Sequence, residues 1–182
     1  MKRIILLLSI CFLFFAFYST SMYDENYQVV KTIETVEIRQ YPVAIYASYT
    51  KEKNDSNSQF RVLAAYIFGA NKQNEEIGMT SPVNMVQSEQ SEMLFPMPNR
   101  YDMSNLPTPN NQKIKIIEMQ ERTVAAIKFS GYATSSKIAH KKKELLKILN
   151  DNGVSHKNQF EVLVYDPPYK IINRRNELIV II

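Results

Sequence analysis

Apolar and polar residues alternate over much of the chain, which is the pattern of strands that bury one face. Between Thr32 and Thr50 the apolar positions are Ile33, Val36, Ile38, Val43, Ile45 and Ala47. The alternation is interrupted at Tyr41-Pro42. Because proline has no amide proton to donate to a neighbouring strand, this region is predicted to form strands that break at Pro42.

Two other segments have apolar residues at spacings of three and four, which indicates helices that bury one side. The first helix is predicted over residues 58–68 and ends at Gly69, and the second over residues 135–150, followed by Gly153. The inward positions are Phe60, Leu63, Ala64, Ile67 and Phe68 in the first helix, and Ile138, Leu145, Ile148 and Leu149 in the second.

The order of elements repeats along the chain. Further strands are predicted at residues 79–86, 93–97, 114–117, 124–129, 160–165 and 177–182, so each half has the order strand, strand, helix, strand, strand. The segment Val43-Ala44-Ile45 with Ser48-Tyr49 is echoed by Val124-Ala125-Ala126-Ile127 with Ser130-Gly131-Tyr132. We interpret this repetition as an internal duplication. The predicted fold is α+β, a distorted antiparallel β-barrel with both helices packed outside.

The chain begins with a short apolar segment. Lys2 and Arg3 precede an apolar run that extends to Tyr18, and small polar residues follow. This layout is typical of a signal peptide, and the run is short for a spanning helix, which needs about 20 apolar residues. Residues 1–21 are therefore predicted to be a signal peptide, cleaved before Met22, or alternatively an N-terminal membrane anchor.

These boundaries leave residues 22–182 as one domain, a usual domain size. The expected location is exported, either periplasmic or secreted, or anchored to the membrane by the N-terminus. The domain has 20 basic and 18 acidic residues, so the charge does not favour nucleic-acid binding. The one cysteine, Cys11, lies in the leader, which excludes a disulfide or thiolate metal site within the domain. We expect a monomer.

The sequence contains no motif of a catalytic or metal site. The two histidines, His140 and His156, have no cysteine or acidic cluster at metal-ligand spacing. Neither a Gly-x-Ser-x-Gly motif nor a glycine-rich phosphate loop occurs. Binding is therefore favoured over catalysis, and we do not expect an enzyme.

The adjacent residues Arg174 and Arg175 lie near two acidic residues, Asp166 and Glu177. Two arginines in this setting could form a buried ion-pair lock for the last strand, or could clamp a ligand carboxylate with paired hydrogen bonds. The sequence favours the lock.

Five segments, in this order and spacing, resemble the SOUL haem-binding family from about Tyr27 to the C-terminus. They are Phe60-Arg61-Val62-Leu63-Ala64-Ala65-Tyr66-Ile67-Phe68-Gly69-Ala70-Asn71, Met79-Thr80-Ser81-Pro82-Val83, Phe95-Pro96-Met97-Pro98, Phe129-Ser130-Gly131-Tyr132, and Tyr165-Asp166-Pro167-Pro168 with Arg174-Arg175-Asn176-Glu177. The resemblance implies a barrel built from a duplicated unit and a shallow apolar groove for a tetrapyrrole along the first helix.

Carried onto this sequence, the resemblance assigns seven residues to haem. Phe60, Leu63, Ala64 and Ile67 would line the groove, and Lys72, Arg174 and Arg175 would be available to the haem propionates. Animal members carry Met where this chain has Ala64 and Arg where it has Asn57. No axial iron ligand is assignable, so haem, or another flat hydrophobic molecule, would be bound with low affinity.

Two other functions remain as alternatives. One is a module of the same fold that binds a different small molecule or is structural. The other is a small hydrolase, because related duplicated folds include enzymes that use a Tyr and a Glu in a cleft. Tyr66 or Tyr165 with Glu177 are the residues available for that role.

Overall fold

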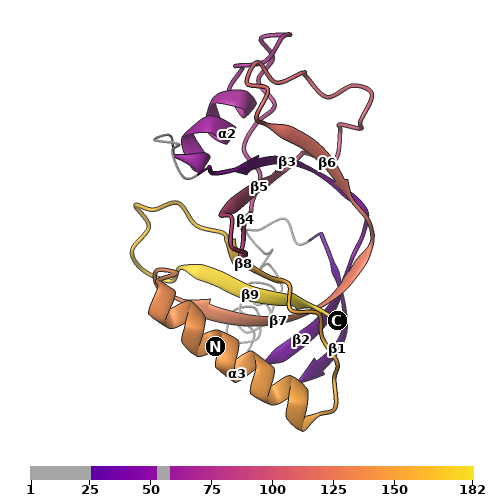
Figure 1. Ribbon diagram of the computed structural model, residues 1–182, viewed down its shortest axis with the longest axis vertical. Coiled ribbons are helices and arrows are strands. Elements are labelled where there is room, and N and C mark those ends of the chain that lie inside the picture. Colours follow the sequence, from indigo (N-terminus) through magenta and orange to yellow (C-terminus); the bar gives the residue numbers. More distant parts are fainter. Residues whose placement is uncertain (1–25, 53–57) are drawn as a thin grey trace, which may run out of the picture.

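A curled antiparallel sheet carries two helices, as the computed structural model shows for residues 26–52 and 58–182 (Figure 1). Within these residues the strands are β1 (Gln28–Ile33), β2 (Val36–Tyr41), β3 (Ala44–Thr50), β4 (Val83–Val86), β5 (Glu92–Pro96), β6 (Lys115–Met119), β7 (Arg122–Ser130), β8 (Phe160–Val164) and β9 (Arg175–Ile181). The helices are α2 (Gln59–Ile67) and α3 (Ser135–Asp151). The predicted α+β fold is confirmed, whereas the predicted leader lies outside the described residues.

The strand order is β1-β2-β7-β9-β8-β4-β5-β3-β6, and it reveals how the duplicated halves combine. The strands of one half lie in the order β3-β5-β4 and those of the other in the order β7-β9-β8, and the two halves meet where β4 pairs with β8. The first strand of each half is exchanged. β2 continues into β3 but pairs with β7, and β6 continues into β7 but pairs with β3.

Both helices cover the same face of the sheet. At the junction of the halves, Val83 lies opposite Val164 and Met85 opposite Val162, so these four side chains share a face. Val83 belongs to the apolar cluster under α2, and Val162 to the cluster under α3. Figure 1 shows α2 above the curled sheet and α3 below it. We call the opposite face, which the helices leave uncovered, the inner face.

The two helices bury their side chains with the same spacing. Leu63, Tyr66 and Ile67 are the buried residues of α2, and Leu145, Ile148 and Leu149 are those of α3. The predicted helices at 58–68 and 135–150 agree with the observed bounds to within one residue at each end. This shared pattern supports the internal duplication.

Two strand predictions differ from the structure. The strand predicted from Thr32 to the break at Pro42 is two strands in the structure, because the chain turns at Glu34, whose φ is 53°, between β1 and β2. Residues 28–32 of β1 are all exposed, so this edge strand has no alternating pattern to detect. β4 begins at Val83 rather than Met79, because Pro82 cannot donate a backbone hydrogen bond. In residues 26–52 and 58–182, no helix has the length and apolar character to cross a membrane.

The packing of α3 predicts a large loss of stability from Leu149→Ala. Leu149 is fully buried, so truncation removes apolar contacts and leaves a cavity, which costs about 2–5 kcal/mol. Urea unfolding of the purified protein measures the change. Lys143→Ala, at an exposed position of the same helix, is the matched control and should alter stability by no more than about 0.5 kcal/mol. An equal effect of both substitutions would contradict the assigned core.

Candidate functional site

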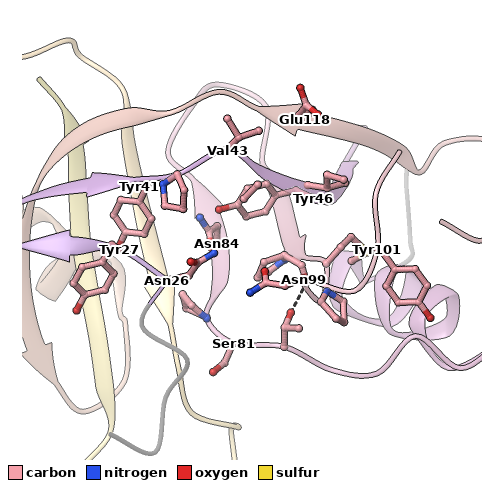
Figure 2. Close-up of a pocket in the computed structure, with 18 of the residues that line it drawn as sticks. Asn26, Tyr27, Tyr41, Val43, Tyr46, Ser81, Asn84, Asn99, Tyr101 and Glu118 are labelled. Carbon is pink, nitrogen blue, oxygen red and sulfur yellow. Dashed lines mark hydrogen bonds between the residues drawn. The ribbon is translucent and has the colours of Figure 1, made fainter. Parts of the chain in front are cut away.

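A cavity of about 240 Å³ opens on the inner face of the sheet (Figure 2). Its walls come from the β2–β3 corner, the segment that leads into β4, the loop after β5 and the end of β8. Five tyrosines contribute to the lining: Tyr27, Tyr41, Tyr46, Tyr101 and Tyr165. The cavity therefore combines aromatic rings with polar groups, and Figure 2 shows the Tyr46 hydroxyl reaching inward toward Asn84.

A buried ion pair beside the cavity joins β2 to β9. The Arg39 guanidinium donates to both oxygens of the Glu177 carboxylate, at 2.5 and 3.1 Å, and both side chains are fully buried. Arg175 also donates to this carboxylate, at 2.7 and 3.0 Å, and the Tyr165 hydroxyl donates at 2.9 Å. Arg39 in turn lies 4.1 Å from the centre of the Tyr27 ring. One carboxylate thus holds two arginines and a tyrosine in place.

The charges fix the protonation states in this network. Burial alone would raise the pKa of Glu177, but hydrogen bonds and charge from Arg39 and Arg175 hold it below its usual value. Burial raises the pKa of Tyr41, Tyr46 and Tyr165, so these phenols stay protonated at neutral pH.

The same network argues against the hydrolase alternative. A general base needs an unsatisfied oxygen and a pKa near the working pH, whereas the Glu177 carboxylate accepts hydrogen bonds from three side chains. Tyr66 lies on α2, and its hydroxyl donates to the Pro107 carbonyl at 2.7 Å. Tyr66 and Glu177 thus have separate partners, whereas Tyr165, which lines the cavity, contacts Glu177 directly.

A second buried ion pair joins β7 to β8. Arg122 donates to both oxygens of Glu161, and Asn84 from β4 donates to the same carboxylate at 2.8 Å. Arg122 and Glu161 also line another cavity, of about 540 Å³, at the β6–β7 corner. This corner corresponds in the duplicated fold to the β2–β3 corner of the first cavity. The inner face thus carries two cavities, with the Arg122–Glu161–Asn84 cluster between them.

The groove residues inferred from the sequence divide into two groups. Leu63 and Ile67 point into the core under α2 and are 0% and 1% exposed. Phe60 is 44% exposed, Ala64 is half-buried and Phe68, just after the helix, is 60% exposed. Because these last three are four residues apart, they form an apolar stripe about 12 Å long on the outside of α2. We call Phe60, Ala64 and Phe68 the α2 stripe.

The three cationic residues assigned to propionates lie in different settings. Lys72 is exposed in the turn after α2. Arg174 is buried and donates to the carbonyls of Pro167, Lys170 and Asp166, and Arg175 is engaged with Glu177. The predicted ion-pair lock is thus present for Arg175 and Glu177, whereas Arg174 binds backbone carbonyls instead of a carboxylate. The main buried partner of Glu177, Arg39, was not foreseen. Asn57 lies outside the described residues.

The histidines do not join any of these sites. His140 lies on α3 and is exposed, and His156 follows α3 and lies beside Phe160. In residues 26–52 and 58–182, no group of three or more His, Cys, Asp or Glu side chains could hold a metal ion. These residues offer no metal centre made of such ligands.

Comparisons with known proteins agree on family and fold. The family model described as SOUL heme-binding protein matches residues 23–181. Heme-binding protein 1 of Sus scrofa is 29% identical over 121 residues, which cover 62% of this chain and 64% of that protein. Heme-binding protein 2 of Homo sapiens is 28% identical over 157 residues, which cover 78% of this chain and 75% of that protein. The chain thus spans less than two thirds of the heme-binding protein 1 relative.

Solved structures extend the likeness in fold alone. The C-terminal domain of EcmrR superposes with a TM-score of 0.58 at 14% identity, covering 85% of this chain and 96% of that one. A hydrolase from Listeria innocua superposes with a TM-score of 0.59 at 9% identity, covering 84% of this chain and 94% of that one. At such identities the shared architecture carries no information on substrates.

The Arg39–Glu177 pair predicts that Glu177→Gln destabilises the protein by about 3–5 kcal/mol, because the substitution leaves buried guanidinium charge without its carboxylate. It should also change the dependence on pH. The pKa of Glu177 is lowered by folding, so its stabilisation is present above the unfolded-state pKa and is lost as pH falls through the folded-state value.

Urea unfolding at several pH values between about 7 and 2 measures both effects. The unfolding free energy of the wild type should fall below about pH 4.5, and that of Glu177→Gln should fall less steeply. The control is Glu118→Gln at an exposed position. Parallel pH curves for Glu177→Gln and the wild type would show that this carboxylate does not stabilise the fold.

Proposed function

Because the chain belongs to the SOUL heme-binding protein family, we propose that it binds haem or another flat tetrapyrrole. The observation that carries this proposal is the family match over residues 23–181, which includes every described strand and helix. The relatives named heme-binding protein 1 and 2 support the same ligand class. The biological role that fits is a carrier or buffer.

The α2 stripe is the surface proposed for the ligand. Phe60 packs edge-on against Phe95, with ring centroids 5.4 Å apart, so its ring is supported from below and exposed above. Ala64 leaves a low point between the two phenylalanines, where a flat molecule could rest. Leu63 and Ile67 contribute by anchoring the helix on the sheet rather than by contacting the ligand.

The inner-face cavity that the five tyrosines line fits a tetrapyrrole less well than the α2 stripe does. Its volume of about 240 Å³ is below the roughly 300–1,000 Å³ that is typical of sites enclosing a drug-sized ligand. Its hydroxyls and amides also suit a smaller polar molecule. Binding of such a molecule there is the second candidate function, and the five tyrosines that line the cavity favour it.

A surface site without an iron ligand limits the affinity. A porphyrin buries several hundred Å² of apolar surface, and at about 25 cal/mol per Å² this supports roughly micromolar binding once association costs are subtracted. Lys72 is the cation proposed for a propionate, since Arg174 and Arg175 already hold the β8–β9 loop and Glu177. The proposal includes export of the domain. Residues 1–21 are either cleaved as a signal peptide or kept as a membrane anchor.

Hemin titration should give a saturable shift of the Soret band, and replacing Phe60 and Phe68 together by serine should weaken binding by at least about tenfold, since two exposed rings are lost. Tyr169→Ser, which removes an exposed ring from the other half, is the matched control and should bind as the wild type does. A non-saturating response of the wild type would remove haem as the ligand. Unchanged binding by the double variant would move the site away from α2.

Hemin dimethyl ester has no propionate charge, so it distinguishes an ion pair with Lys72 from apolar contact. Lys72→Gln should weaken hemin binding by about two- to fivefold, the range for an exposed ion pair, and should leave binding of hemin dimethyl ester unchanged. Absorbance titrations with both ligands at low ionic strength give the comparison. An equal loss for both ligands would show that the propionates do not contact Lys72.

A further inference from the structure

The loop between β8 and β9 carries exposed apolar side chains at its tip. Tyr169, Ile171 and Ile172 are 83%, 74% and 74% exposed, the highest values for large apolar residues in the part of the chain that the structure describes. Single exposed apolar residues are ordinary on protein surfaces. Three within four consecutive positions concentrate apolar surface at one loop tip, which is the kind of surface that binds a partner.

The exposure of this tip is built into the folded loop. Arg174, which is buried, donates to the Pro167 carbonyl at 2.5 Å and to the Lys170 carbonyl at 2.8 Å. The Asp166 carboxylate accepts from the Lys170 ammonium and from the Arg175 amide, each at 2.6 Å. Backbone on both sides of the tip is therefore held, and the apolar side chains are presented to solvent rather than folded back.

The surroundings of the tip match the interface of a lipid bilayer. Tyr132 is 47% exposed, and its hydroxyl donates to the Pro168 carbonyl, so a second tyrosine stands beside the loop. Lys170 lies within the tip, and its ammonium group is partly exposed while it pairs with the Asp166 carboxylate. Tyrosine and lysine beside aliphatic side chains are typical of segments that rest at the level of the lipid headgroups.

A protein partner fits this surface less well. A stable protein interface buries about 800 Å² on each side, usually over 20–30 residues, whereas the patch is a projecting tip of three side chains. Figure 1 shows the loop extending away from β8 and β9 at the edge of the molecule. A bilayer accepts such a tip without a matching surface.

A side-chain contact links the start of the described chain to the end of this loop. The Tyr27 hydroxyl accepts a hydrogen bond of 3.1 Å from Arg175, the residue that follows the loop. Nine positions separate Tyr18, the end of the apolar run, from Tyr27, and an extended chain of that length spans about 30 Å. Attachment of the apolar run to a membrane would therefore keep the domain within about 30 Å of that membrane.

From these observations we propose that Tyr169, Ile171 and Ile172 insert into the interfacial region of a lipid bilayer. The inserted loop gives the domain a second point of membrane contact and a fixed orientation on the surface. This inference is independent of haem binding, because it uses none of the residues of the α2 stripe.

A tryptophan placed at the tip provides the test, because the chain contains no tryptophan. In the full chain carrying Ile171→Trp, phosphatidylcholine vesicles should shift the indole emission to shorter wavelength, and brominated acyl chains should quench it. Met103→Trp, at an exposed position in the other half of the molecule, is the matched control and should respond to neither. Far-UV circular dichroism confirms that both variants fold.

Other outcomes would overturn the proposal. Co-sedimentation with vesicles and an unchanged emission would show that the N-terminal segment binds while the loop stays in water. An emission shift that depends on protein concentration without vesicles would show that the tip packs against a second copy.

A second substitution tests the contribution of a neighbouring side chain. In a chain that carries both Ile171→Trp and Ile172→Asp, the response of the indole should require roughly tenfold more lipid, because one aliphatic side chain no longer inserts.

Discussion

The exchange of β2 and β6 between the two halves is the constraint on which the rest of the structure depends. Neither half can complete its sheet alone, because β2 pairs with β7 and β6 pairs with β3. The sheet is also curled, and the face opposite the helices lies on the inside of the curl (Figure 1). Charged side chains on that face must then find partners, as Arg39 does with Glu177 and Arg122 does with Glu161.

Most of the fold follows from local patterns in the sequence. Helical spacing gave α2 and α3 almost to the residue, and the repeated order of elements indicated the duplication. The exchange itself is invisible to such patterns, because pairing between strands that lie far apart in the sequence, such as β2 with β7 and β3 with β6, leaves no local signal. The buried ion pairs of the inner face were also missed, because their residues look solvent-facing in the sequence. Glu37, Arg39 and Tyr41 alternate with apolar residues in β2, which is the pattern of a solvent-facing side.

The candidate site illustrates a limit of residue-by-residue inference from a family. The helix that the resemblance assigned to haem is present and amphipathic, but its strongest apolar positions, Leu63 and Ile67, are the ones that the core requires. A ligand can use only the margin of that face, where Phe60 and Phe68 emerge. Sequence spacing identifies the apolar side of a helix, whereas the boundary between the part that packs and the part that remains accessible depends on the strands beneath it.

The central position of β9 in the sheet affects how the chain folds. β9 is the last described strand in chain order, yet it lies between β7 and β8 in the middle of the sheet. The sheet therefore cannot close until β9 has been synthesised, and its many long-range pairings favour slow folding. Until β9 pairs, the edges of β7 and β8 stay exposed to association with other chains.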